Sequence, residues 1–184
     1  MDRGERKFVR EIELRVGRAI NTYGLAGAGD RLLVALSGGK DSLALLEILA
    51  GRRKRLPITY EVVAAHVSMS SVPYEIDREA VEAFCRELGV PLHCRRVEID
   101  LKPDDQTSIC FLCSWHRRKA LFDMMKELSC TRLVFGHNLD DIVETLLLNM
   151  VFQGSIGAMP PKLALFGGEF EVVRPLALVT EAEL

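Results

Sequence analysis

The sequence has no long apolar segment. No stretch approaches the roughly 18 consecutive apolar residues that a membrane-spanning helix needs. The charged segment Met1–Lys7 is followed by no apolar run, so no signal peptide is expected. The net charge is only −2, which argues against a generic nucleic-acid coat protein but not against a local basic face on an enzyme. We therefore expect a globular, cytoplasmic protein without a membrane partner.

Cysteine is also scarce, with five residues in 184. An odd number in a chain expected in the cytoplasm argues against a disulfide framework and leaves metal binding, redox chemistry or packing. The length is sufficient for one domain with a sizeable core. We expect a single domain over 1–184, with a leading helix and loop at 1–29, an α/β core at 30–176, and the start of a further C-terminal part at 177–184.

The most informative segment is Leu32–Leu46, where an apolar run ends in a polar loop and a second apolar run follows. A strand, a glycine turn and a helix in this order direct backbone N–H groups and a helix N-terminus at an anion. Two glycines let the backbone approach a ligand closely, while two serines and a lysine add donors and charge. This glycine loop consists of Ser37, Gly38, Gly39, Lys40, Asp41 and Ser42.

Two common phosphate-binding motifs do not fit the glycine loop. Val34 stands where the Walker pattern needs glycine, and Asp41 follows Lys40 where that pattern needs serine or threonine. The dinucleotide pattern G-x-G-x-x-G is absent at this strand end. The hexapeptide resembles the PP-loop of ATP pyrophosphatases, which split ATP into AMP and pyrophosphate. The alternative is an ordinary turn with Asp41 or Ser42 as a helix cap.

Apolar patterns along the chain alternate between strands and helices. Strands are predicted over 32–36, 58–67, 92–99, 132–135 and 171–173. Helices are predicted over 5–23, after the glycine loop, and over 75–88, 113–128 and 140–150, with a polar loop at 100–108. This alternation predicts an α/β fold with a doubly wound, parallel five-stranded sheet. Ligands of such sheets bind at the carboxyl ends of the strands, where His66 and His137 fall beside the glycine loop.

A second polar group follows the strand predicted at 132–135. A helix that begins at Asp140 puts Asp141, Glu144 and Thr145 on one face. Carboxylates beside a triphosphate are natural Mg²⁺ ligands. The alternative is a capping aspartate followed by acidic first-turn residues that the helix dipole stabilises.

Cys110 and Cys113 form a third group at a predicted junction of loop and helix. Two thiolates at this spacing can chelate one metal ion or cluster. The helix N-terminus and the cations after it favour thiolates. The pair supplies only two ligands, so Cys130 or a partner chain would have to supply a third; the alternative is two buried cysteines. Cys85 and Cys94 fall inside predicted elements and are expected in the core.

Together these residues resemble the PP-loop tRNA-thiolation enzymes, most closely the tRNA 2-thiocytidine synthetase family. The similarity spans most of the chain and includes the three groups above, Asn149-Met150, Ala158–Lys162 and Arg174-Pro175-Leu176. The Met-Pro-Pro-Lys element and the C-x-x-C pair distinguish this family from the lysidine synthetases. Family members continue past the Arg-Pro-Leu element with another cysteine motif, and Trp115-His116 departs from the family pattern.

The resemblance implies an adenine-nucleotide α-hydrolase-like (Rossmann-like) fold and ATP-dependent adenylation of a tRNA base, followed by sulfur transfer. It implies ATP and Mg²⁺ as cofactors, with Lys40, Asp41 and Asp141 in catalysis. It also implies an iron–sulfur cluster, with zinc as the alternative, at Cys110 and Cys113. The implied nucleotide-binding residues are Ser37, Gly38, Gly39, Lys40, Asp41, Ser42, Ala65, His66, Gly136, His137, Asp140, Asp141 and Glu144.

The expected partners are a tRNA substrate, a sulfur donor such as a cysteine desulfurase, and a second copy of the chain in a homodimer. Three other functions stay open at this point. One is a lysidine-type tRNA ligase, and another is an amidating enzyme of the GMP- or NAD-synthetase kind. The third is a non-catalytic ATP- or metal-binding fragment that works with a partner.

Overall fold

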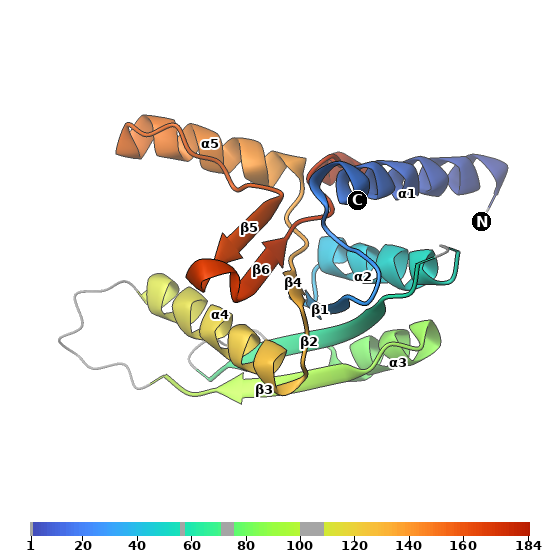
Figure 1. The fold of residues 1–184 in the computed structure, drawn as a ribbon, viewed down its shortest axis with the longest axis horizontal. Helices are drawn as coiled ribbons and strands as arrows, with labels where there is room; N and C mark the ends of the chain where they lie inside the picture. Colours follow the sequence, from blue (N-terminus) through green and yellow to red (C-terminus); the bar gives the residue numbers. More distant parts are fainter. Residues whose placement is uncertain (1, 56–57, 71–75, 100–108) are drawn as a thin grey trace.

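The computed structural model describes residues 2–55, 58–70, 76–99 and 109–184. These residues form a six-stranded sheet in the order β3-β2-β1-β4-β6-β5 (Figure 1). All neighbouring strands are parallel except β5, which runs antiparallel to β6. The strands are β1 (Arg31–Ala35), β2 (Glu61–Met69), β3 (Leu92–Val97), β4 (Arg132–Val134), β5 (Lys162–Leu165) and β6 (Phe170–Val173). The predicted α/β class is confirmed, and the edge strand β5 is added to the five predicted strands.

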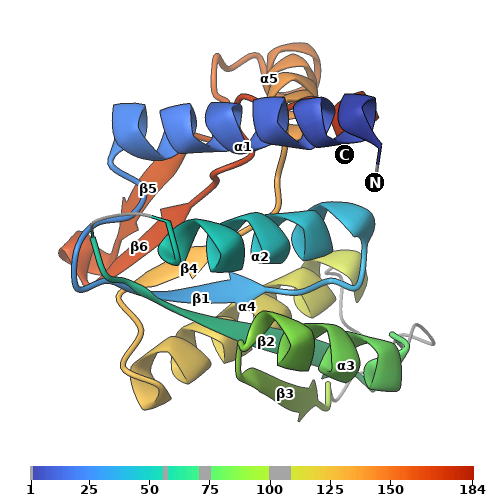
Figure 2. The ribbon, with the colours of Figure 1, turned by 90° about the vertical axis from the view of Figure 1, so that its right-hand side faces the viewer.

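Helices cover both faces of the sheet, as Figure 2 shows. The α-helices are α1 (Arg3–Tyr23), α2 (Lys40–Arg53), α3 (Arg78–Leu88), α4 (Ile109–Glu127) and α5 (Leu139–Gln153). Successive residues of β1 point to opposite faces. Leu32 and Val34 pack in the core with α1, α2 and α3, whereas Leu33 packs in a second core with α4. The apolar run of β1 is therefore continuous because both of its faces are buried.

Several element boundaries differ from the prediction. Helix α4 begins at Ile109 rather than 113, so both cysteines of the C-x-x-C pair lie within its first turns. The third strand ends at Val97, and β2 begins at Glu61. The loop predicted at 100–108 and the predicted helix start at 75 lie outside the described residues. The helix start expected at 177–184 is a short 3₁₀ helix, η2 (Glu181–Glu183).

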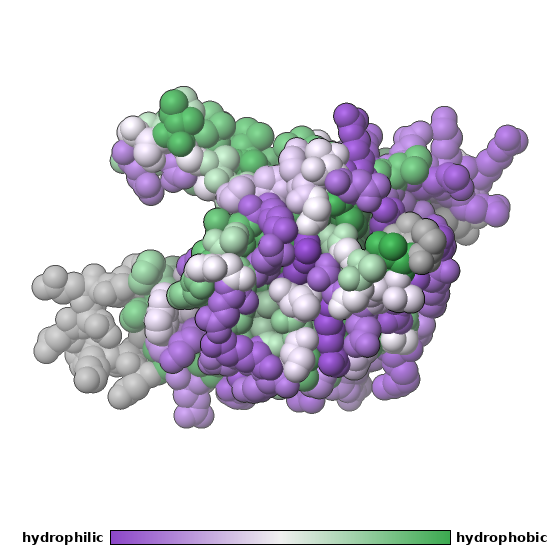
Figure 3. Space-filling view, in the orientation of Figure 1, coloured by the Kyte–Doolittle hydropathy of each residue, from purple (hydrophilic) through white to green (hydrophobic). Residues whose placement is uncertain are grey.

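Helix α5 differs from the others because none of its residues is buried. It projects from the body of the molecule in Figure 1, and hydrophobic side chains gather at its far end in Figure 3. Its exposed apolar residues, with one from the loop after it, are Val143, Leu147, Leu148, Met150, Val151, Phe152 and Ile156. Within the described part of the chain, no helix combines the length and the apolar character needed to cross a membrane.

Candidate functional site

The glycine loop connects β1 to α2 and is held by its own hydrogen bonds. Gly38 has a φ of +88°, a left-handed conformation that favours glycine. The Gly39 N–H donates to Ser37 Oγ at 3.2 Å, and the Ser42 hydroxyl donates to the Gly39 carbonyl at 2.9 Å. Gly39 is the N-cap of α2, and no side chain caps this helix end. The alternative of an ordinary Asp41 or Ser42 cap is therefore wrong, and the first N–H groups of α2 are available to an anion.

The turn between β4 and α5 packs directly on the glycine loop. A Cβ atom on Gly136 would lie 3.2 Å from the backbone N and Cα of Ser42, so only glycine fits without a shift. The Asn138 side-chain amide donates to Asp41 Oδ2 at 3.1 Å. The other oxygen of this carboxylate, Oδ1, is buried and has no hydrogen-bond partner in the described structure. The two segments therefore form one site with a free acceptor inside it.

Asn138 was not among the predicted site residues. Its side-chain oxygen accepts from the Asp141 N–H, and the Asp141 carboxylate accepts from the Asn138 N–H at 2.8 Å. These reciprocal bonds form a capping box at the start of α5. An asparagine directly before an acidic helix start is an N-cap pattern that the sequence did contain. The capping aspartate of the alternative interpretation is therefore wrong, because the N-cap is Asn138, but Asp140 and Asp141 do lie in the first turn as that interpretation expected.

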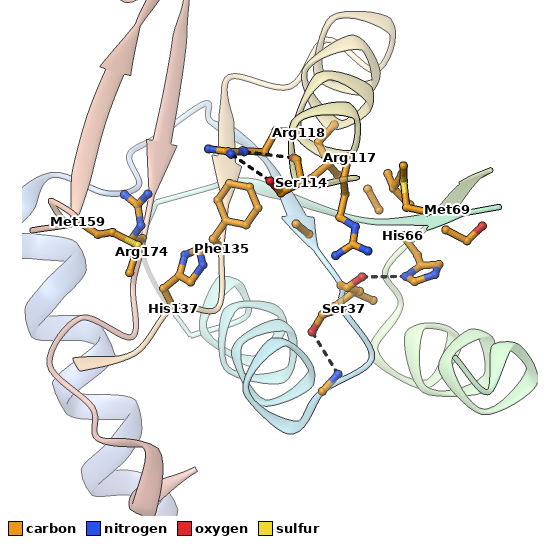
Figure 4. Close-up of a pocket in the computed structure, with 17 residues that line it drawn as sticks. Ser37, His66, Met69, Ser114, Arg117, Arg118, Phe135, His137, Met159 and Arg174 are labelled. Carbon is orange, nitrogen blue, oxygen red and sulfur yellow. Dashed lines mark hydrogen bonds between the residues drawn. The ribbon is translucent and has the colours of Figure 1, made fainter. Parts of the chain in front are cut away.

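Two cavities meet at the glycine loop. The small cavity, of about 240 Å³, is lined by the loop, Phe135, Gly136 and His137. The large cavity, of about 680 Å³, has the size of a small-molecule site and shares Ser37, Gly39, Phe135 and His137 with the small one. It continues past the end of β1 and along β2, from Ala65 to Met69, to α4 (Figure 4). Its remaining wall includes Ala65, His66, Ser114, Arg117, Arg118, Met159 and Arg174.

The large cavity carries positive charge. Three arginines and two histidines line it, and no carboxylate is among its described lining residues. Arg174 is only 7% exposed; its Nη1 donates to the Pro160 carbonyl at 2.7 Å, while its Nε is without a hydrogen-bond partner in the described structure. Burial lowers the pKa of the Arg174 guanidinium from its ordinary value. A buried cation of this kind fits an anionic group in the cavity.

His137 lies beside Arg174 in Figure 4 and is electrically coupled to it. Burial lowers the pKa of His137, and the positive charges of Arg174 and Arg118 lower it further, against the opposing effect of Asp141. The ring is therefore neutral near pH 7. Its Nδ1 atom is buried without a hydrogen-bond partner in the described residues. A neutral imidazole can offer one donor and one acceptor to a bound ligand.

The other predicted nucleotide-binding residues lie in several places. His66 is buried inside β2, which continues to Met69, beyond the predicted end at residue 67, and its Nδ1 donates to the Leu36 carbonyl at 2.9 Å. Lys40 lines the small cavity, but its ammonium donates to the Glu181 carbonyl at 3.1 Å. Asp140 accepts from the Glu181 N–H at 2.6 Å. Glu144 is exposed and lines neither cavity.

The acidic residues therefore do not converge as a set of metal ligands. Asp140 is bonded to the C-terminal segment, Asp141 closes the capping box, and Glu144 points outward. Among the residues that the structure describes, no group of three or more histidine, cysteine, aspartate or glutamate side chains could hold a metal ion. At the glycine loop, the carboxylate oxygen without a hydrogen-bond partner in the described structure is Oδ1 of Asp41.

The C-x-x-C pair lies one turn from the wall of the large cavity. Cys110 is exposed and Cys113 is buried, and at this spacing they are neighbours on the surface of α4. Cys110 also falls on the same helical stripe as Ser114 and Arg117, which line the large cavity. The structure thus brings the two cysteines to the α4 end of the site.

The remaining cysteines lie elsewhere. Cys130 follows the far end of α4, and the helix from Cys113 to Glu127 alone is roughly 21 Å long, so its proposed role as a third ligand is wrong. Burial also raises the pKa of the Cys130 thiol, which disfavours the thiolate. Cys85 is buried in the core as expected. The same expectation for Cys94 is wrong: alternate residues of the edge strand β3 face outward, and this thiol is exposed.

An uncapped helix N-terminus behind a glycine loop, with cavities along the carboxyl ends of parallel strands, defines a nucleotide-binding α/β protein. Residues 10–184 match the family model described as the PP-loop domain. A tRNA-cytidine(32) 2-sulfurtransferase from Syntrophotalea carbinolica is 40% identical over 184 residues, which cover 98% of this chain and 70% of that protein. The chain therefore belongs to the PP-loop family, in the branch of the tRNA-cytidine(32) 2-sulfurtransferases, and the predicted resemblance is confirmed.

Two further comparisons agree with this placement. The tRNA-cytidine(32) 2-sulfurtransferase of Geobacter sulfurreducens is 40% identical over 179 residues, which cover 95% of this chain and 69% of that protein. The structure of the U34-tRNA thiolase NcsA from Methanococcus maripaludis, with its 4Fe-4S cluster, superposes with a TM-score of 0.77 at 24% identity. The superposition covers 96% of this chain and 60% of the thiolase, and it shows a shared fold.

Proposed function

We propose that the protein binds ATP at the glycine loop, adenylates a cytidine of tRNA and replaces the C2 oxygen of that base with sulfur. The observation that carries this proposal is the large cavity, which extends from Ser37 and Gly39 to Ser114 and Arg117 on the cysteine-bearing helix. A single cavity can thus hold a nucleotide at one end and present the activated base to sulfur at the other. The names of the relatives support tRNA-cytidine as the substrate.

The residues of the glycine loop fit the phosphates of ATP. The N–H groups at the start of α2 and the hydroxyl of Ser37 supply donors without a carboxylate cap in the way, while the Ser42 hydroxyl holds the loop through the Gly39 carbonyl. Lys40 supplies positive charge at the developing pyrophosphate once it leaves Glu181. Ala65 and His66, on β2 beside the end of β1, line the side of the cavity where adenine or ribose would lie.

The donor set also fits Mg²⁺ that arrives with ATP. The free Oδ1 atom of Asp41 is an anionic oxygen beside the phosphate site, and Asp141 is linked to it through Asn138. When bound, Mg²⁺ would neutralise charge on the phosphates. Asp41 would bind the ion, and Asn138 would hold the carboxylate in place.

Cys110 and Cys113 fit a metal cluster at the α4 end of the cavity. The NcsA thiolase carries a 4Fe-4S cluster, and we propose a cluster of this kind for these two thiolates, with zinc as the alternative. Two protein thiolates leave further coordination positions to other ligands. A bound cluster would carry sulfur supplied by a donor such as a cysteine desulfurase. Arg117 and Arg118 line the same part of the cavity and would supply positive charge to an anionic adenylate bound there.

We propose that the protein forms a homodimer through α5. Its exposed leucines, valines and phenylalanine cover more than one side of the helix, and a helix that is apolar all round is normally buried. Pairing of α5 with the same helix of a second copy would remove this surface from water, and two-fold symmetric pairs are the commonest oligomers. We also propose a cytoplasmic location, because the proposed substrate, tRNA, is found there.

The proposal is tested with the anaerobically reconstituted protein, tRNA, ATP, Mg²⁺ and a sulfide source. We expect tRNA-dependent pyrophosphate release together with a thiolated cytidine detected by mass spectrometry of the digested tRNA. Gly39→Val should abolish both, because a larger side chain would intrude on the phosphate site. Pyrophosphate release that requires lysine would indicate a lysidine-type ligase, and release that requires ammonia an amidating enzyme. No turnover with any tRNA would favour a non-catalytic fragment.

A further inference from the structure

Trp115 is the only tryptophan of the chain, and it lies on the surface of α4 with 48% of its area exposed. The Lys119 ammonium lies 5.7 Å from the centre of its ring, and the His116 ring meets it edge-on at 4.9 Å. Neighbours on the helix surface, rather than the core, therefore hold this ring. Phe111 on the same helix is exposed as well, and neighbouring exposed aromatic groups are typical of an interaction site.

The position of Trp115 relates it to the large cavity. Ser114 and Arg118 line that cavity and are adjacent to Trp115 on α4, one residue before and three residues after it. Phe111, Trp115 and Lys119 follow one another at intervals of four residues, and all three are exposed. They form a stripe beside the cavity-facing stripe of the same helix. The aromatic stripe thus borders the wall of the cavity on its α4 side.

The charge on this part of α4 has one sign. Arg117, Arg118 and Lys119 are consecutive and exposed, and no aspartate or glutamate occurs between Cys110 and Phe122. Cations attract the phosphates of a nucleic acid, whatever its sequence. Aromatic rings and guanidinium planes stack on bases that are unpaired, because the faces of paired bases are hidden in the duplex. The combination fits a single-stranded segment of RNA.

We propose that Trp115 is a stacking platform for an unpaired base next to the target cytidine. The inference rests on the proposed function and specifies how its RNA substrate is held. A base that enters the large cavity must leave its neighbours in the loop, and this loss of stacking is unfavourable. Stacking of an adjacent base on Trp115 compensates for it, while Arg117 and Lys119 contact the flanking phosphates. This site would therefore bind an unpaired RNA loop more tightly than an RNA duplex.

The single tryptophan makes a direct test. Its fluorescence is titrated with an RNA hairpin that has an unpaired cytidine in its loop, and with a fully paired duplex of the same composition. We expect the hairpin to quench the emission and the duplex to leave it largely unchanged. Binding itself is followed separately by the anisotropy of a labelled RNA. Hairpin binding that leaves the tryptophan emission unchanged would overturn the inference but not the proposed function.

Substitutions provide the matched comparison. Trp115→Ala should weaken hairpin binding about tenfold, since stacking contributes about 1–3 kcal/mol per base, whereas Trp115→Phe should keep most of the affinity. Tyr23→Ala, which removes an exposed aromatic from the far face of the molecule, should have no effect. Equal affinity of Trp115→Ala and the unaltered protein would overturn the inference. Failure of the unaltered protein to bind the hairpin would contradict the proposed function and the inference with it.

Discussion

Asn138 donates a hydrogen bond from its side-chain amide to Asp41, and this 3.1 Å contact joins two segments 97 residues apart. The same side chain caps α5 through its oxygen atom, so each end of one amide has a separate partner. Asn138 is only 3% exposed, and neither bond can be replaced by water without opening the site. Its position makes the geometry of the glycine loop depend on the start of α5.

Substitution of Asn138 can separate the two roles. Asn138→Ala removes both bonds and should lower the free energy of unfolding by about 2 kcal/mol, measured by urea denaturation. Asn138→Ser keeps a capping oxygen but loses the amide donor to Asp41, so it should lose about 1 kcal/mol, roughly half of the loss in Asn138→Ala. We expect both variants to bind ATP more weakly in calorimetric titrations, because Asp41 loses its support. Parental ATP affinity in Asn138→Ser would show that the contact is merely structural.

Gly136 offers a second test of the close contact between the two segments. Gly136→Ala places a methyl group 3.2 Å from the backbone of Ser42, and overpacking of this kind costs about 1–3 kcal/mol. We expect lower stability and weaker ATP binding, both measured as above. Gly157→Ala is the control, because the nearest atom to its new methyl group, the Asn149 amide nitrogen, is at an ordinary 3.6 Å. An alanine at 136 with unchanged ATP affinity would mean that the segment can move without disturbing the phosphate site.

Sequence patterns within short segments were enough to predict much of this site. The glycine loop, the strand before it and the helix after it lie within one short segment, so spacing alone indicated their geometry. The acidic start of α5 was also found, although its Asp141 closes a capping box. The short edge strand β5 was missed because only four residues pair with β6, and two of its neighbours in sequence are prolines.

Contacts between segments far apart in the sequence could not be predicted from local sequence patterns. Arg174 belongs to a motif that the sequence analysis noted, but nothing in its neighbours shows that the guanidinium is buried in the cavity beside His137. The bond from Lys40 to Glu181 likewise depends on how the C-terminal segment folds back over α2. Long-range packing decided these positions, and it also decided that no residue of α5 is buried in the described part of the chain.

His137 should make stability depend on pH. Its pKa in the folded protein is below the ordinary 6.5, because burial and Arg174 disfavour the charged ring. The unfolded chain therefore binds the proton more readily, and stability falls as the pH drops through 6.5 toward the lower folded value. We expect the unaltered protein to lose more stability than His137→Asn between about pH 7.5 and about pH 5.5 in urea denaturation. Parallel losses in both proteins would contradict the assignment.

The exposed face of α5 should govern association. Leu147 is 54% exposed on α5, and Leu14 is 62% exposed on α1, which makes them a matched pair. Light scattering should give a mass of about twice the 20.6 kDa chain for the unaltered protein and for Leu14→Glu. Leu147→Glu should give a monomer, since a buried unpaired carboxylate is unfavourable at an apolar interface. A dimer that persists in Leu147→Glu would place the contact elsewhere.

Cys110 and Cys113 should hold the metal through both thiolates. Their spacing puts them side by side on the first turns of α4, where both sulfur atoms can reach one metal ion or cluster. After anaerobic reconstitution, Cys110→Ser and Cys113→Ser should each bind iron at least about tenfold more weakly, measured as iron and sulfide content and visible absorption. ATP affinity should not change, because the glycine loop uses other residues.

Cys94→Ser is the matched control for the pair, since it removes an exposed thiol from β3. It should keep the full iron content, because Cys94 does not belong to the C-x-x-C pair and does not line the large cavity. The assignment fails if the double variant of Cys110 and Cys113 retains its iron. It also fails for sulfur transfer if the unaltered protein takes up stoichiometric zinc and no iron, because zinc has no redox chemistry and would make the pair a structural clamp on α4.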